Sequence, residues 1–277
     1  DIKAFKMDGL GNDLKRNWKT KLPIPATGRR TRSSSIYSPD RDFKISRSKF
    51  NDFLTCPRCF YLDRVVGLEP PGIPGFTLNS LTDELLKKEF DKCRKEQKPH
   101  PIFKANDLGH LVPFDHHDLD LWRDSLHHGL QARFKETNII LSGGIDDVWQ
   151  NTKNKNLVIA DYKSQAKKGE VDQVAYLSDP YHKNYKIQMD FYAYLLEQMG
   201  FKVEPTSYFL VCNALHNEDG FFGQMNFSQT LIPYEVNTDW IEEKIIGMIE
   251  VLNGKGTPNP NPCCKNCAYV NEAKKIY

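Results

Sequence analysis

The sequence predicts an α/β (α+β) fold in which a mixed central sheet is flanked by helices. Short runs of β-branched and aromatic residues alternate with longer segments that carry apolar residues at helical spacing. Alternation of this kind is typical of a sheet covered by helices. None of the apolar runs in the 277 residues approaches the length of a membrane span, and there are no internal repeats. We therefore expect no membrane association.

Each element follows from a local pattern along the chain. The first helix is expected at 46–54, with Ser46 or Ser48 as its N-cap. Further helices are expected at 78–94, 119–131, 186–199 and 240–252. Strands are expected at 138–149, 157–163, 205–213 and 222–233. The first two strands flank a turn signal at 151–156, so we expect them to form a hairpin.

The predicted hairpin carries the residues with the clearest chemistry. Side chains alternate along a strand, so Asp161 and Lys163 share one face and Tyr162 points to the other. Asp146 lies near the end of the partner strand, where cross-strand neighbours approach within about 5 Å. Two such carboxylates repel each other unless a cation lies between them, and oxygen ligands favour Mg²⁺ or Mn²⁺. The lysine can then orient an attacking water or stabilise transition-state charge, which predicts phosphodiester cleavage.

Four segments in a fixed order resemble the PD-(D/E)XK nuclease superfamily, in particular its RecB-like branch, which includes CRISPR-associated RecB-type exonucleases. They are Leu-Thr-Asp-Glu-Leu-Leu at 81–86, Gly-Gly-Ile-Asp-Asp at 143–147, Ile-Ala-Asp-Tyr-Lys at 159–163 and Gln-Met-Asp-Phe-Tyr at 188–192. The resemblance covers roughly residues 45–270. It implies a restriction-endonuclease-like core.

The resemblance also implies roles for individual residues. Asp146, Asp161 and the backbone carbonyl of Tyr162 would ligate the metal, and Lys163 would be catalytic. Asp147 is the alternative to Asp146, which the family pattern GxxD favours. Gln188 and Tyr192 match the QxxxY motif, whose side chains hold the active site and the nucleic-acid strand.

One position departs from the family pattern. The family usually supplies a histidine from an earlier helix, in a G-x3-H-x2-L context. Here Asp83 occupies that place and Glu84 follows it. Either acid can complete the set of metal ligands.

Two Cys-x2-Cys pairs predict a second centre, since such pairs chelate one ion or cluster from a tight turn. The preferred ligands are Cys56, Cys59, Cys264 and Cys267, with Cys263 as a substitute. RecB-like nucleases with an iron–sulfur cluster resemble this arrangement but use one early and three late cysteines. Thiolates accept Zn²⁺ as well as a 4Fe–4S cluster, so both stay open. Free buried thiols are the third interpretation, and they fit the reducing, cytoplasmic location that we expect.

The N-terminal part is predicted to be an extended basic arm, residues 1–44, ahead of a nuclease-like domain at 45–277. Between Lys15 and Lys49 basic residues outnumber acidic ones, in a segment rich in Ser and Pro. Such an arm can follow phosphates or remain a solvated tail. Residues 4–13 are similar to the beginning of a diaminopimelate epimerase, but no later segment supplies the context of that enzyme's two opposed cysteines. We expect no epimerase activity.

These patterns predict a metal-dependent (exo)deoxyribonuclease that hydrolyses DNA in repair, recombination or processing. The first alternative is a catalytically silent nucleic-acid-binding module of the same fold. The second is a structural zinc or iron–sulfur protein, which leaves Asp161 and Lys163 unexplained. The net charge is only +2, so contacts with DNA must depend on local charge.

Overall fold

The computed structural model describes residues 14–72 and 75–276 as a mixed α/β protein with two sheets. The epimerase-like residues 4–13 lie outside the described residues. One sheet has the strand order β2-β5-β6-β7-β8 and the other β1-β4-β3. The pairs β6–β7 and β1–β4 are parallel, and the remaining neighbours are antiparallel. The predicted fold class is confirmed, with two mixed sheets in place of one central sheet.

The strands are β1 Phe43–Ser46, β2 Leu111–Pro113, β3 Leu130–Arg133, β4 Ile139–Gly143, β5 Asp147–Asn151, β6 Leu157–Gln165, β7 Thr206–Ala214 and β8 Phe227–Glu235. The α-helices are α1 Arg47–Thr55, α2 Pro57–Arg64, α3 Thr77–Glu96, α4 Pro101–Ala105, α5 Leu119–Arg123, α6 Gln173–Ser178, α7 Lys183–Gln198, α8 Ile241–Asn253 and α9 Lys265–Ala273. Short 3-10 turns are η1 Ser33–Ser35 and η2 Pro180–His182.

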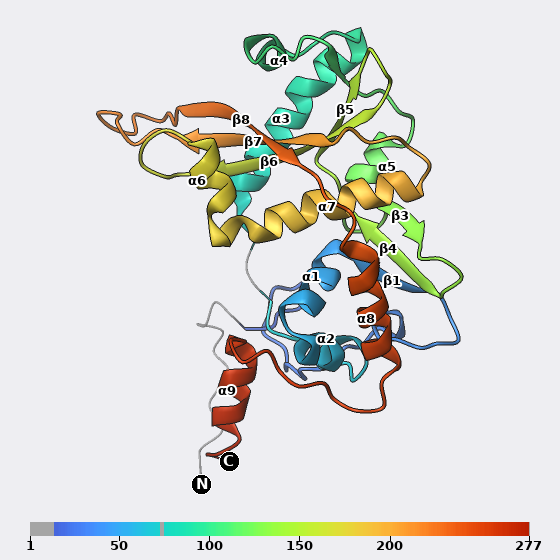
Figure 1. The fold of residues 1–277 in the computed structure, drawn as a ribbon. Coiled ribbons are helices and arrows are strands. Elements are labelled where there is room, and N and C mark those ends of the chain that lie inside the picture. Colours follow the sequence, from blue (N-terminus) through green and yellow to red (C-terminus); the bar gives the residue numbers. More distant parts are fainter. Residues whose placement is uncertain (1–13, 73–74, 277) are drawn as a thin grey trace.

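Helices α3 and α7 cover opposite faces of the five-stranded sheet (Figure 1). Tyr162 and Leu210 point to the α3 face, where they share a core with Phe90 of α3. Ile159 and Phe209 point to the other face and belong to the larger core that includes α7. The alternation read from 157–163 is therefore present in β6, and it places consecutive side chains in two different cores.

Helices α1, α2 and α8 pack together beside the three-stranded sheet (Figure 1). Ser46 caps α1, since its side chain accepts a hydrogen bond from the Lys49 amide. Pro57 occupies the first position of α2, where no amide donor is needed. Phe53 and Phe60 then meet edge to face, with ring centroids 5.6 Å apart. This contact fixes α1 against α2.

The helix predicted at 119–131 was wrong in its second half. Helix α5 ends at Arg123, and the Asp124 side chain accepts hydrogen bonds from the amides of Leu126 and His127. Gly129 follows with a φ of +74°, a left-handed conformation that turns the chain into β3. The side chain of Asp124 thus offers the backbone a turn in place of another helical step.

The segment before β1 contacts the rest of the protein through residues 29–41. Arg30 pairs with Asp63 at 2.8 Å and with Glu69 at 3.0 Å. Arg29 donates to the Val66 carbonyl, and the Asn138 amide donates to backbone carbonyls between 38 and 41. Arg30 therefore connects this segment to the rest of the protein by ion pairs. The domain boundary at residue 44 remains a prediction. Among the described helices, none has both the length and the apolar character required to cross a membrane.

Asp63 connects three parts of this region. Its buried carboxylate accepts hydrogen bonds from Arg30 of the N-terminal segment, Lys49 of α1 and the neighbouring Arg64. Burial by itself raises the pKa of this carboxyl, but the three cations lower it to about 2. A folded-state pKa below the unfolded value means that ionised Asp63 stabilises the fold.

We predict that Asp63→Asn lowers the free energy of unfolding by about 2 kcal/mol near pH 7, since each pKa unit corresponds to about 1.4 kcal/mol. The contribution is present above about pH 4 and is lost as the pH falls toward 2, so the two proteins should converge there. Urea unfolding at several pH values measures this. Asp52→Asn, which removes only a half-exposed partner of Lys49, is the control and should have a much smaller effect. A difference that does not change with pH would contradict the prediction.

Candidate active site

The expected strand at 138–149 is interrupted where the chain passes from one sheet to the other. Strand β4 ends at Gly143 and β5 begins at Asp147, so only β5 forms the predicted hairpin with β6. The two glycines permit this crossing. A Cβ on Gly143 would lie 2.5 Å from the Tyr192 ring, and one on Gly144 would lie 2.4 Å from the Ser125 Cβ. The prediction of a single strand was wrong because close tertiary contacts divide it.

The crossing carries Asp146 to the middle of β6. Its Oδ2 accepts a hydrogen bond of 2.9 Å from the Tyr162 amide, which is joined to Asp161 by one peptide bond. Asp161 has no exposed surface. The structure therefore brings together the two acids that the sequence singled out, one from the crossing just before β5 and one from β6.

Helix α7 supplies the groups that hold Asp161. Gln188 Nε2 donates to Asp161 Oδ1 at 2.6 Å and lies 3.2 Å from the Tyr192 hydroxyl. That hydroxyl donates to the Gly144 carbonyl in the crossing. Lys163 Nζ forms an ion pair with Asp161 Oδ2. The predicted Gln188 and Tyr192 thus connect β6 to the segment before Asp146.

Helix α3 brings Asp83 to the same place. Lys87 Nζ lies 2.7 Å from Asp83 Oδ2 and 3.8 Å from Asp146 Oδ1, so one ammonium group bridges both carboxylates. Glu84 points outward, is exposed and pairs with Lys88. The geometry favours Asp83 over Glu84 as the third acid. Sequence reasoning missed Lys87, although its i,i+4 spacing from Asp83 is the usual one for a helical ion pair.

Asp147 has a different environment from Asp146. It is completely buried, and its carboxylate contacts Arg94, Arg123 and the Tyr162 hydroxyl. Arg123 also donates to the Asp146 carbonyl at 3.2 Å. Asp147 therefore orders the core behind the site and, through Arg123, holds the backbone of Asp146. Its side chain does not share the space between Asp146 and Asp83.

The charges of the site are strongly coupled. Burial and the nearby Asp146 carboxylate raise the pKa of Asp161 to about 7, although Lys163 opposes the shift. Burial would lower the pKa of Lys163, but the attraction of Asp161 and Asp146 raises it. Burial and Asp146 also raise the pKa of Asp83. Each of these carboxylates would ionise more readily beside an additional cation.

A hard divalent cation fits this donor set. Asp83 Oδ1 is buried, and within the described ranges it has no hydrogen-bond partner. Asp161 Oδ2 likewise receives no well-aligned hydrogen bond there, despite its ion pair. Carboxylate and carbonyl oxygens are the ligands that Mg²⁺ and Mn²⁺ prefer. Asp83, Asp146 and Asp161 are the side chains that would hold such an ion, and the Tyr162 carbonyl stays a predicted fourth ligand.

The four preferred cysteines also meet. They lie at the starts of α2 and α9, two helices in the lower part of Figure 1. Sγ of Cys59 lies 3.5 Å from both Cys264 and Cys267, and Cys56 lies 3.7 Å from Cys267. Burial raises the pKa of the Cys59 and Cys267 thiols, whereas at Cys56 amide donors and the neighbouring thiols outweigh burial and lower the pKa to about 7. Cys263 is exposed and outside this group.

A sequence profile of the PD-(D/E)XK nuclease superfamily matches residues 44–271. The chain belongs to this superfamily. The crystal structure of a presumed exonuclease from Eubacterium rectale is similar at 14% sequence identity and a TM-score of 0.38, over 87% of this chain and 94% of that chain. No curated protein matches the chain. The matched range contains the residues of the acidic site and both cysteine pairs.

We predict that Lys87→Met tightens Mn²⁺ binding to the metal-free protein roughly tenfold. The substitution removes a positive charge that lies between two carboxylates and repels the ion. Two unit charges 4 Å apart near a protein surface interact by roughly 4 kcal/mol. A third of this energy already corresponds to a tenfold change in affinity. Isothermal titration calorimetry measures the affinity. Lys88→Met removes the adjacent but exposed lysine and should leave the affinity unchanged. An unchanged or weaker affinity for Lys87→Met would show that the ammonium does not compete with the ion.

Proposed function

We propose that this member of the PD-(D/E)XK superfamily is a metal-dependent nuclease that hydrolyses DNA phosphodiester bonds. The observation that carries the proposal is the meeting of Asp146, Asp161 and Lys163, with Gln188 and Tyr192 bonded to the same segments. A silent binding module would have no need for this buried, charge-coupled group, which is costly to maintain.

The side chains divide the chemistry among them. Asp83, Asp146 and Asp161 would hold Mg²⁺ or Mn²⁺, which supplies Lewis acidity and a more acidic water. The water oxygen forms a bond to phosphorus and gives up a proton to solvent, while the bond from phosphorus to the leaving oxygen breaks and that oxygen gains a proton from solvent. Gln188 keeps the Asp161 carboxylate in one orientation through its amide donor. Tyr192 fixes the crossing that carries Asp146.

Lys163 acts as a cation in this scheme. Burial lowers the pKa of Lys163, but the attraction of Asp161 and Asp146 outweighs it and raises the pKa, which favours the ammonium form. In this proposal it donates hydrogen bonds to the attacking water or to a phosphate oxygen. The Tyr185 ring, whose centroid is 4.6 Å from Nζ, limits the directions in which this ammonium can move.

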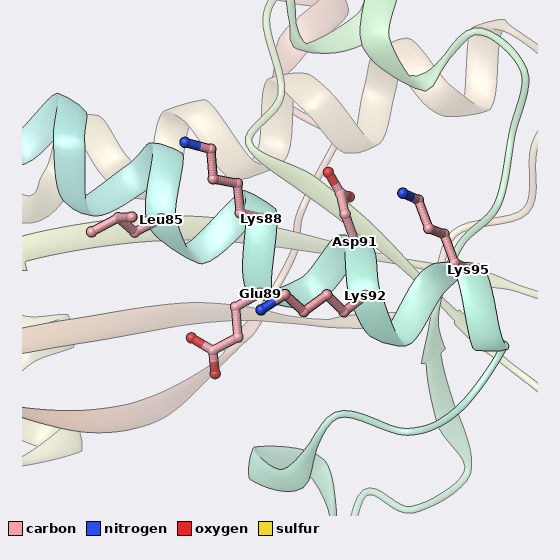
Figure 2. Close-up of a pocket in the computed structure, with 6 residues that line it drawn as sticks. All are labelled: Leu85, Lys88, Glu89, Asp91, Lys92 and Lys95. Carbon is pink, nitrogen blue, oxygen red and sulfur yellow. The ribbon is translucent and has the colours of Figure 1, made fainter.

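The outer side of α3 offers further contacts for a phosphate backbone. A hollow of about 740 Å³ lies along the helix and is lined by Leu85, Lys88, Glu89, Asp91, Lys92 and Lys95 (Figure 2). Lys95 is twelve positions beyond Asp83, or about 18 Å along the helix. We propose that the exposed lysines of this surface contact DNA that enters the site, with an affinity that falls as salt rises.

The finer assignment belongs to the same proposal. The order of the four motifs supports the RecB-like branch. An exonuclease in DNA repair, recombination or processing is the role that this branch suggests.

We predict that Lys163→Ala lowers the rate of DNA cleavage by at least about a hundredfold, because a donor to the reacting centre is lost. Labelled single- and double-stranded DNA, incubated with Mg²⁺ or Mn²⁺, provides the assay. Circular dichroism and a DNA-binding titration should be nearly unchanged. Lys167→Ala, an exposed lysine just beyond β6, is the matched control and should cleave normally. Full cleavage by Lys163→Ala would exclude the mechanism.

A second pair of variants separates the two candidate acids of α3. Asp83→Asn should weaken Mn²⁺ binding and slow cleavage, each by about tenfold or more, because a carboxylate ligand is lost. Glu84→Gln should leave both unchanged, since that side chain points to solvent and pairs with Lys88. The reverse result would assign the ligand to Glu84 and contradict the proposed site.

A further inference from the structure

The four clustered cysteines occupy equivalent positions on two helices. Cys56 is the N-cap of α2 and Cys59 lies in its first turn, while Cys264 is the N-cap of α9 and Cys267 lies in its first turn. Because the four thiols meet, the N-terminal ends of the two helices meet as well. Helix N-termini stabilise negative charge, so both helices favour thiolates at this point.

The spacing of the sulfur atoms fits one tetrahedral ion. Zinc binds thiolate at about 2.3 Å, and four such bonds in a tetrahedron place the sulfurs roughly 3.8 Å apart. The observed separations are 3.5, 3.5 and 3.7 Å. All four sulfur atoms lie within 4.8 Å of one another. The described set is therefore close to the size of a four-thiolate zinc site.

The same spacing does not fit the 4Fe–4S cluster that the RecB-like resemblance implies. In such a cluster each thiolate binds a different iron, and iron and sulfide atoms fill the space between the thiolates. Sulfur atoms separated by 3.5–3.7 Å are near van der Waals contact and leave no room for this core.

The backbone around the sulfurs is fixed by hydrogen bonds that do not involve an ion. The Asn261 amide donates to Cys56 Sγ, and the Asn261 side chain donates to the Thr55 carbonyl at 2.8 Å. The Cys263 amide donates to Asn261 Oδ1 at 2.9 Å. Arg58 Nε donates to the Pro258 carbonyl at 3.0 Å. The segment before α9 is thus held against the junction of α1 and α2, which orients both late ligands.

We propose that Cys56, Cys59, Cys264 and Cys267 bind one Zn²⁺ ion in a closed four-thiolate site, in place of an iron–sulfur cluster. Four protein ligands leave no open position, so the ion is structural and takes no part in hydrolysis. It replaces the four thiol protons, which pass to solvent as the ion binds. The site connects α2 to α9 and is independent of the proposed nuclease activity.

Elemental analysis of the full chain, purified without chelators and without oxygen, tests the proposal. We expect one zinc per chain, no acid-labile sulfide and no visible absorbance. After zinc removal, Co²⁺ should bind one to one and produce the thiolate charge-transfer and tetrahedral d–d bands of a cobalt–thiolate centre. Zinc removal should also lower the melting temperature, because metal binding contributes to folding.

Two serine variants provide the matched comparison. Cys264→Ser should lose the zinc, while Cys263→Ser, at the exposed neighbouring cysteine, should retain it. If Cys264→Ser does not fold, the cobalt spectrum and the metal stoichiometry of the unaltered chain still distinguish a four-thiolate zinc site from an iron–sulfur cluster. Iron with equimolar sulfide, iron in place of zinc, or a disulfide-bonded protein that takes up no Co²⁺ would overturn the proposal.

Discussion

The Asp161 carboxylate lies without any exposed surface on a central strand, and a charge in that position must be compensated by its neighbours. Lys163 supplies the charge and Gln188 supplies a hydrogen bond. Each does so from a fixed position. Lys163 lies two residues after Asp161 on β6, and Gln188 lies on α7. The packing of α7 against the sheet is therefore part of the electrostatics of the site. Strand β6 and helix α7 cannot rearrange to bring Asp161 into contact with water, as a surface loop could.

The crossing between the two sheets adds a steric constraint to the electrostatic one. Gly143 allows the Tyr192 ring to approach the backbone, and the Tyr192 hydroxyl then bonds to the Gly144 carbonyl. Asp146 emerges directly from this contact. Behind it, Asp147 and Arg123 hold the same stretch of backbone from the opposite side. Residues outside the acidic group thus determine where the Asp146 carboxylate stands.

Much of this arrangement could be read from the sequence because it is local. Alternation along 157–163 places Asp161 and Lys163 on one face, and the helical spacing of Gln188 and Tyr192 puts them on one side of α7. The division of 138–149 between two sheets could not be read, since it depends on what lies against Gly143 and Gly144. The early end of α5 depends on one aspartate and one glycine. Lys87 was missed because an i,i+4 ion pair is common on helix surfaces.

The cysteine cluster has a consequence for how the molecule is made. Its partners are separated by 205 to 211 positions, so α2 and both sheets are synthesised before α9 reaches the solvent. Until then Cys56 and Cys59 lack Cys264 and Cys267 as neighbours, and two thiols bind a metal ion far more weakly than four. Closure of so long a loop is entropically costly, and it becomes cheaper once the sheets have brought its ends together. The junction of α2 and α9 can therefore form only after α9 has been synthesised.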